Sequence, residues 1–155
     1  MIQAKGITVA TKWQKIKIDL SGYGLNSDQK DEVADLIIER IVNRTDQGKD
    51  KEGKRFPGYS KSYKESLDFK VAGKKGRPVD LQLSGDMLAA LEVLDKTSRS
   101  VTVGFERGSE ENAKADGNIR GTYGKPTPDP KKARDFLGIT ETELSKIIKF
   151  VKAQE

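Results

Sequence analysis

An apolar stripe with helical spacing constrains the fold of this chain more than any other feature of its sequence. Between residues 28 and 45, apolar side chains recur at three- and four-residue intervals: Val33, Leu36, Ile37, Ile38, Ile41 and Val42. A period near 3.6 residues is typical of an amphipathic helix that buries one face. Ser27 is a good N-cap, and Asp28 lies where an acid favours the helix dipole. We therefore expect a helix over about 28–45 that anchors the core, with Arg44 on another face.

Alternation of apolar and polar residues predicts short strands in several places. Near the N-terminus the alternating side chains are Trp13, Lys15 and Lys17 against Ile16, Ile18 and Leu20. The stretches VDLQLSG (79–85) and RSVTVGF (99–105) alternate in the same way. Between them, DMLAALEV predicts a short helix that runs into another strand. That strand is expected to pair with 99–105 through the turn DKTS.

Two more helices are predicted toward the C-terminus. Ser109 is placed to cap a short helix in GSEENAKADG, whereas residues 118–135, with three Pro, are expected to be extended or irregular. Thr140 and Glu143 have the spacing of a capping box. Apolar residues then recur at helical spacing, at Leu144, Ile147, Ile148 and Val151. The last helix is therefore expected to be amphipathic.

These elements predict an α+β fold, with a small antiparallel β-sheet packed with the long helix and the C-terminal helix. The length of 155 residues indicates a single domain over 1–155. Within it we expect a strand or hairpin segment at 1–20 and a long flexible basic loop at 46–78. About 34% of residues are apolar and 34% are charged, which indicates a modest core with much solvated or partner-covered surface.

The residue types exclude several kinds of catalytic and metal site. The chain has no Cys and no His, so thiolate ligands, imidazole ligands and the commonest general base are missing. We expect no enzymatic activity, no metal and no cofactor. No apolar run approaches the roughly 18 residues of a membrane span. The N-terminus does not resemble a signal peptide, so we expect synthesis in a cytoplasm.

The net charge of +5 comes from one Gly-rich segment. Residues 44–80 contain eleven Lys and Arg and six Asp and Glu, and the rest of the chain has eighteen of each. Within the segment, GKDKEGKR (48–55) is similar to a phosphate-binding loop, but Arg55 stands where Ser or Thr would hold magnesium. An EF-hand alignment from Asp46 fails because Lys51 and Pro57 occupy its sixth and twelfth positions. We therefore interpret the stretch as a charged loop.

Basic side chains of this segment are candidates for contact with DNA or with an acidic partner. Lys and Arg neutralise phosphates, and neighbouring aromatic rings stack on bases. The candidate contacts are Lys49, Lys51, Lys54, Arg55, Lys74, Lys75 and Arg77. The aromatic residues Phe56 and Tyr59 have an alternative role as anchors that tie the loop to a small core. The sequence leaves open whether the loop faces DNA or protein.

Several motifs in fixed order resemble the phage virion morphogenesis family, the tail completion proteins of tailed bacteriophages and prophages. A long helix leads to GKDKEGKRFPGYSKSYKES, and the later stretches are LQLSGDMLAALEV, VTVGF, GTYG and ARDFLGITETELSKIIKFV. The resemblance covers about 27–151, and its most specific part is the box formed by Arg134, Phe136, Leu137 and Gly138. Phe56 stands where the family often has Trp, and Asp135 where Pro is common. The family's His-containing stretch after the VTVGF strand has no counterpart here.

The resemblance implies a structural role at the head–tail joint of a virion. Such a protein finishes the tail and joins it to the DNA-filled head. It is expected to form a homo-oligomeric ring, six-fold by preference, around the DNA channel and to contact other neck and tail proteins. Arg134, Phe136 and Leu137 are then candidates for assembly contacts. Alternatively, Leu137 or Ile139 packs on Leu144 as a hydrophobic staple within its own domain.

The concentration of positive charge supports a different hypothesis, a small non-specific DNA-binding accessory protein. Its candidate contacts are the same basic side chains of residues 44–80. Such binding weakens steeply as salt rises, because it releases counterions from the duplex.

Overall fold

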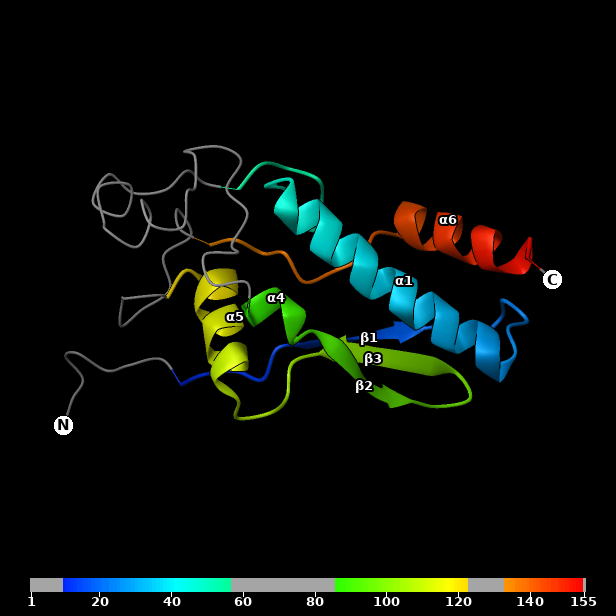
Figure 1. The fold of residues 1–155 in the computed structure, drawn as a ribbon, viewed down its shortest axis with the longest axis horizontal. Helices are drawn as coiled ribbons and strands as arrows, with labels where there is room; N and C mark the ends of the chain where they lie inside the picture. Colours follow the sequence, from blue (N-terminus) through cyan, green and yellow to red (C-terminus); the bar gives the residue numbers. More distant parts are fainter. Residues whose placement is uncertain (1–9, 57–85, 123–132, 155) are drawn as a thin grey trace.

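The computed structural model describes residues 10–56, 86–122 and 133–154 of the chain. It confirms an α+β fold in which helix α1 (Ser27–Asp46) lies over one face of a three-stranded antiparallel sheet. Helix α6 (Glu141–Lys152) runs beside α1, and the shorter helices α4 (Asp86–Ala89) and α5 (Glu110–Arg120) pack together at one end of the sheet (Figure 1). No helix in these three ranges is long and apolar enough to span a bilayer.

The sheet has strand order β1-β3-β2, so the last strand in the sequence lies in the middle. The strands are β1 (Lys15–Asp19), β2 (Glu92–Lys96) and β3 (Ser100–Gly104). A β-bulge interrupts the pairing of β2 with β3 between Val93 and Asp95. The structure confirms the strand predicted near the N-terminus, the strand predicted at 99–105, and the short helix that runs into β2. The predicted pairing of β2 with the 99–105 strand is also confirmed. The strand predicted at 79–85 lies outside the described residues.

The core forms where α1 packs on the inward face of the sheet and α6 packs on α1. Val33, Ile37 and Ile41 have no exposed surface, which confirms the predicted buried face of the long helix. Every described helix, together with β1 and β3, contributes side chains to one cluster, whereas β2 contributes none: Ile18, Leu20, Val33, Ala34, Ile37, Ile41, Phe56, Met87, Leu88, Leu91, Val101, Val103, Phe105, Ala115, Phe136, Leu137, Leu144, Ile148 and Val151. The core is therefore built from residues that are distant in the sequence.

The helix ends differ from the sequence predictions in two places. Asn26, and not Ser27, caps α1, because its side chain accepts from the Gln29 N–H while the Gln29 side chain accepts from the Asn26 N–H. Helix α5 continues to Arg120, so the prediction of irregular structure from residue 118 is wrong for its first three residues. The predicted caps of α5 and α6, at Ser109 and at Thr140, are both confirmed.

Candidate assembly and DNA-contact surfaces

The GKDKEGKR stretch forms a tight hairpin directly after α1. A β-bridge joins Lys49 to Arg55 across the hairpin. At its tip the Asp50 carboxylate accepts hydrogen bonds from the backbone N–H groups of Glu52 and Lys54, each at 2.9 Å. An Asp side chain that binds the backbone two residues ahead is a common way to close a turn. The Asp50 carboxylate therefore stabilises the turn of the hairpin.

Two glycines allow the hairpin to turn this tightly. Gly48 has a φ of 78° and Gly53 a φ of 85°, in the left-handed region that side chains disfavour. The hairpin is closed at its base by a hydrogen bond from the Phe56 N–H to the Gly48 carbonyl, at 2.9 Å. Residues 48–56 therefore form a hydrogen-bonded hairpin. They belong to the described part of the segment predicted to be a flexible loop. Residues 57–78 of that segment lie outside the described residues.

The hairpin presents three of the seven candidate basic side chains to solvent. Lys49, Lys54 and Arg55 are exposed. Lys51 is half-buried, and its Nζ lies 2.9 Å from the Asp135 carboxylate. Its backbone N–H also donates to the Asp135 carbonyl at 2.9 Å. The remaining candidates lie outside the described residues: Lys74, Lys75 and Arg77.

The described apolar candidates lie in the core and not on a free surface. Phe56 is 2% exposed, Leu137 is 4% exposed, and Phe136 is fully buried. The Phe136 ring meets the Phe105 ring edge to face, with centroids 6.2 Å apart. These three side chains therefore act as core anchors. Tyr59 lies outside the described residues.

Arg134 lies half-buried where the extended segment before α6 begins. Its backbone N–H donates to the Asn118 carbonyl of α5 at 2.7 Å. The first residue of the box is therefore tied to the end of α5, while the apolar residues that follow it enter the core. This extended segment thereby links the C-terminal end of α5 to the start of α6.

A buried arginine joins three separate segments of the chain. The guanidinium of Arg44, at the end of α1, donates to the carbonyls of Phe136 and Gly138, both at 2.8 Å. It also donates to the two carboxylate oxygens of Glu143, at 2.9 and 3.1 Å. Its side chain is only 2% exposed, so the expectation that Arg44 lies on an outer face is wrong. The residue continues the buried stripe, three positions after Ile41.

Glu143 completes this buried centre and caps α6 at the same time. Its carboxylate accepts from the Thr140 N–H at 3.0 Å, and the Thr140 hydroxyl accepts from the Glu143 N–H at 3.1 Å. Arg40 reaches the same carboxylate from α1 at 2.6 Å. Burial by itself raises the pKa of Glu143, but the Thr140 N–H and the two arginines outweigh it, so the pKa lies below its ordinary value. Glu143 is therefore held as a charged, structural carboxylate.

A second polar network fixes the segment before β1 to helix α5. The buried Asp116 carboxylate accepts from Arg120, at 2.6 and 2.7 Å, and from the Gln14 side chain at 2.8 Å. Asn112 accepts from the Gln14 N–H at 2.7 Å and donates to the Lys12 carbonyl at 3.0 Å. Burial opposes the charge of Asp116, yet the Arg120 and Gln14 hydrogen bonds lower its pKa. The Asp116 carboxylate is thereby paired, and it holds the segment before β1 against α5.

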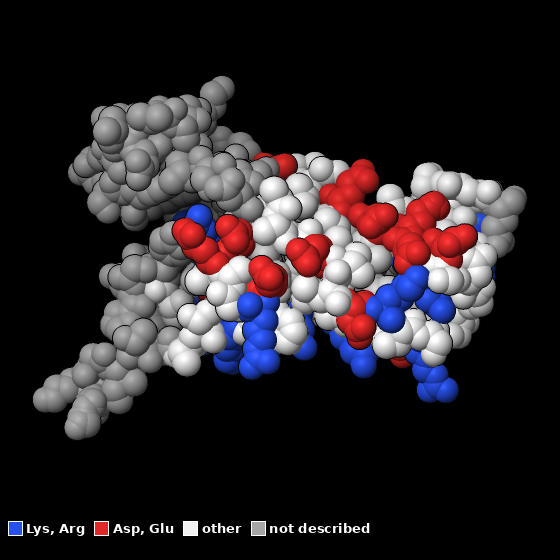
Figure 2. Space-filling model, turned by 60° about the horizontal axis from the view of Figure 1, so that its bottom comes forward, with Lys and Arg blue, Asp and Glu red and all other residues white. Residues whose placement is uncertain are grey.

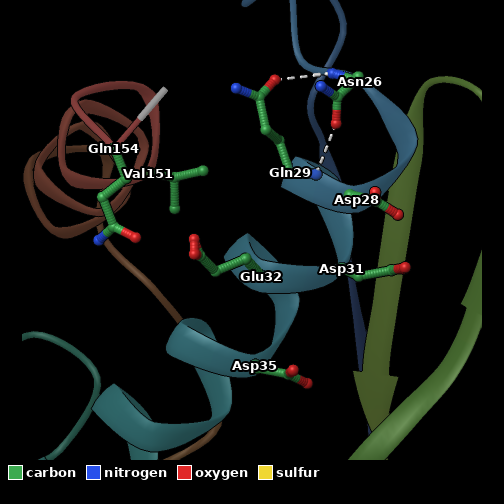
Figure 3. A pocket seen from close by; sticks show the side chains of 8 residues that line it. All are labelled: Asn26, Asp28, Gln29, Asp31, Glu32, Asp35, Val151 and Gln154. Carbon is green, nitrogen blue, oxygen red and sulfur yellow. Dashed lines mark hydrogen bonds between the residues drawn. The ribbon is translucent and has the colours of Figure 1, made fainter.

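The exposed acids of α1 surround a shallow depression beside α6. Its volume is about 470 Å³, and its lining residues are Asn26, Asp28, Gln29, Asp31, Glu32, Asp35, Val151 and Gln154. Figure 3 shows that Glu32 points toward α6, whereas Asp28, Asp31 and Asp35 point to the other side of α1. The carboxylates therefore do not converge on one point. Among the described residues, no group of acids has the arrangement of a metal site.

Charge on the described surface is unevenly distributed. In Figure 2, acidic side chains gather on the upper part of the view and most basic side chains lie along its lower margin.

No family model matches this chain, and no curated protein or solved structure matches it either.

Proposed function

We propose that this chain is a structural tail completion protein of a tailed bacteriophage or prophage. It finishes the tail and joins it to the DNA-filled head, as one member of a homo-oligomeric ring around the DNA channel. The observation that carries this proposal is the order of the resembling motifs along residues 27–151, which ends in the box before the last helix.

The proposal is supported by the way two of these motifs meet in space. Lys51 of the hairpin and Asp135 within the box are 84 residues apart in the sequence, yet they are in contact through both backbone and side chain. A Cβ added at Gly138 would lie 2.7 Å from the Lys51 side chain, so glycine permits this close approach. The exposed cations of the hairpin are therefore held at a fixed place beside the segment that closes the core. Such a rigid, charged projection is suited to contact with a channel or with a neighbouring protein.

Deletion of the gene from its phage or prophage tests the proposal. We expect full heads and complete tails that do not join, seen as separate particles by electron microscopy. Expression of the wild-type chain from a plasmid should restore joined virions. Normal joined virions from the deletion strain would show that the protein has no such role.

A second function, non-specific DNA binding, is favoured by the three exposed hairpin cations. Duplex binding would be measured at low and moderate salt for the wild type and for K49E/K54E/R55E. Binding that falls steeply with salt and is lost in the variant supports this function. The matched control is K146E/K149E, which reverses two exposed charges on α6. No binding at low salt, or equal loss in the control, would exclude a hairpin-based DNA contact.

A further inference from the structure

Both margins of the sheet are strands that pair on one side only. Among the described residues, β1 and β2 each pair with the central strand β3 and with no other strand. A strand margin exposes backbone N–H and C=O groups, and these can pair with another chain. Within the described ranges, the outer edges of β1 and β2 thus have no partner strand, which makes them candidate places for an intermolecular contact.

Charges on the edge strands, on the sheet face opposite the core, repeat with the same polarity in two neighbouring rows. The register across β1, β3 and β2 gives the rows Lys15–Gly104–Glu92 and Lys17–Thr102–Asp95. In each row a base lies on the β1 margin, an acid lies on the β2 margin, and a small uncharged residue separates them. All four charged side chains are exposed. One margin of this face is thus basic and the other is acidic.

Two further charged residues near these margins are already committed to local contacts. Asp19, at the end of β1, accepts from the N–H and the hydroxyl of Ser21, at 2.8 and 2.6 Å. Lys96, at the end of β2, shares a face with Val101 and binds the Asp31 carboxylate of α1 at 2.6 Å. Lys96 is therefore paired within its own chain, whereas Asp19 remains a charged acid near Lys17 and reduces, but does not cancel, the positive charge of the β1 margin.

The inward face of the sheet has a matching apolar row. Ile16, Val103 and Val93 lie in register across the three strands. The central Val103 is fully buried, whereas Val93 is 38% exposed and Ile16 is half-buried. No fourth strand in the described part of the chain covers the core face of either edge strand, and these aliphatic side chains keep exposed surface there. A neighbouring strand at either margin would remove this apolar surface from water.

We infer that the β1 margin of one copy binds the β2 margin of the next copy, so that the rows continue from chain to chain. Lys15 and Lys17 then lie beside Glu92 and Asp95 of the neighbour, and Ile16 covers the neighbour's Val93. Opposite charges in directly adjacent strand positions attract, whereas like charges repel. The inference rests on the proposed function only in taking a second copy as the partner.

The polarity of the rows selects the kind of assembly. Pairing of two β1 margins places Lys against Lys, and pairing of two β2 margins places acid against acid. Only the unlike margins are complementary, so the contact is head to tail. Head-to-tail contacts produce a ring when the rotation between copies closes and a filament when it does not. The β2 bulge bends that margin, and the long Lys side chains tolerate the bend.

Disulfide trapping in the full chain tests the contact without disturbing its charges. The chain has no cysteine, so Ile16→Cys and Val93→Cys each provide the only thiol of their chain. Within one chain these positions are two strand spacings apart, about 9.6 Å. That exceeds the roughly 7 Å Cα separation that a disulfide allows. A bond between them therefore forms only between copies.

We expect an equimolar mixture of I16C and V93C to give mixed dimers after oxidation, and each variant alone to give several-fold less dimer. The chain with both substitutions should give a ladder of higher oligomers. Yields would be measured by non-reducing electrophoresis and intact mass. Lys146→Cys on α6, mixed with V93C, is the control for random collision. Mixed dimers no more abundant than this control would overturn the inference, even if native mass spectrometry shows that the wild-type chain forms rings.

Charge exchange provides a second, independent test on the same trapping pair. K15E/K17E in the I16C chain should reduce the mixed dimer several-fold, and E92K/D95K in the V93C chain should do the same. When both changes are combined in the mixture, the yield should return toward that of the parent pair. Failure of the combined change to restore the yield would overturn the proposed pairing of charges. The deletion experiment tests the head–tail role separately, so the two proposals fail by different results.

Discussion

The buried centre around Arg44 and the hairpin at residues 48–55 use the same types of side chain for opposite purposes. Arg44 is 2% exposed and is surrounded by two carbonyls and a carboxylate. In the hairpin, Lys49, Lys54 and Arg55 are exposed. Only a few residues separate these two uses of positive charge. The difference shows that partners, and not residue type, decide whether a charge holds the fold together or remains available for binding.

The contrast extends to the carboxylates. Glu143 accepts hydrogen bonds from two arginines and from the backbone at the start of α6, and it links that helix to α1. Asp50 instead closes the hairpin turn within its own loop. Loss of the first disconnects distant segments, whereas loss of the second has a local effect. Substitutions in the two regions should therefore differ strongly in their effect on the free energy of unfolding.

The largest loss of stability is expected for Arg44→Ala. The change removes all four hydrogen bonds and leaves the buried Glu143 carboxylate and two carbonyls with fewer partners. Breaking a buried ion pair from one side costs about 3–5 kcal/mol. Urea denaturation followed by circular dichroism measures the loss. The matched control is Arg40→Ala, which removes a half-exposed arginine from the same carboxylate and should cost less than about 1 kcal/mol. Equal losses for the two variants would contradict the role of Arg44.

A smaller loss, confined to a range of pH, is expected for Glu143→Gln. The folded-state pKa of Glu143 lies below its ordinary value of 4.5. Its charge therefore stabilises the fold fully above the unfolded pKa, and this contribution is lost as pH falls through the folded pKa. At neutral pH the variant should be less stable by about 1.5–3 kcal/mol.

The measurement is the free energy of unfolding at several pH values between neutral and acid. The wild type should lose stability more steeply than Glu143→Gln below about pH 4.5, so that the two curves approach each other. Asp116 has a lowered pKa in both proteins, so some acid dependence remains in the variant. Parallel curves over the whole range would show that Glu143 is not held in its charged form.

Local signals made much of the fold predictable, because they lie within a few residues of each other. Helix α1 follows from the spacing of Val33, Ile37 and Ile41, and the start of α6 follows from Thr140 and Glu143. The prediction of Ser27 as the cap of α1 is wrong by one residue, since Asn and Ser both cap helices well and Asn26 directly precedes Ser27. The Gln29 side chain favours Asn26, because it completes a reciprocal pair.

The candidate site was harder to predict, because its contacts are distant in the sequence. The carbonyls that accept hydrogen bonds from Arg44 lie 92 and 94 residues away in the sequence. No pattern in the residues near Arg44 predicts these contacts. Arg44 lies three positions after Ile41, in line with the apolar stripe, but a charged residue is ordinarily expected on an exposed face. The extension of α5 likewise depends on a specific contact, the Arg120–Asp116 pair one turn apart. The exposure of the hairpin cations, in contrast, follows from their high charge and from the glycines around them.

A modest loss of stability is expected for Gly138→Ala, where the buried centre and the hairpin meet. The added Cβ would lie 2.7 Å from Lys51 Cδ and 2.9 Å from Lys51 Cβ, so the Lys51 side chain must shift. Such overpacking costs about 1 kcal/mol. In Lys51→Ala the outer part of that side chain is absent, so Gly138→Ala should cost less there. Thermal or urea unfolding of the four proteins measures the coupling. If the two losses of stability simply add in the double variant, then the Lys51 side chain does not restrict a side chain at position 138.

The smallest effect on stability is expected for Lys54→Ala, within about 0.5 kcal/mol of the wild type. Lys54 is exposed, and its backbone N–H, which the substitution retains, makes the hydrogen bond to Asp50. Urea denaturation beside Arg44→Ala compares the two uses of positive charge directly. A loss above 1 kcal/mol would mean that the Lys54 side chain has a structural partner and is not available for binding. A silent result, combined with weaker binding of K49E/K54E/R55E to DNA or to an acidic neck protein, would assign the hairpin cations to a partner and the Arg44 centre to the fold.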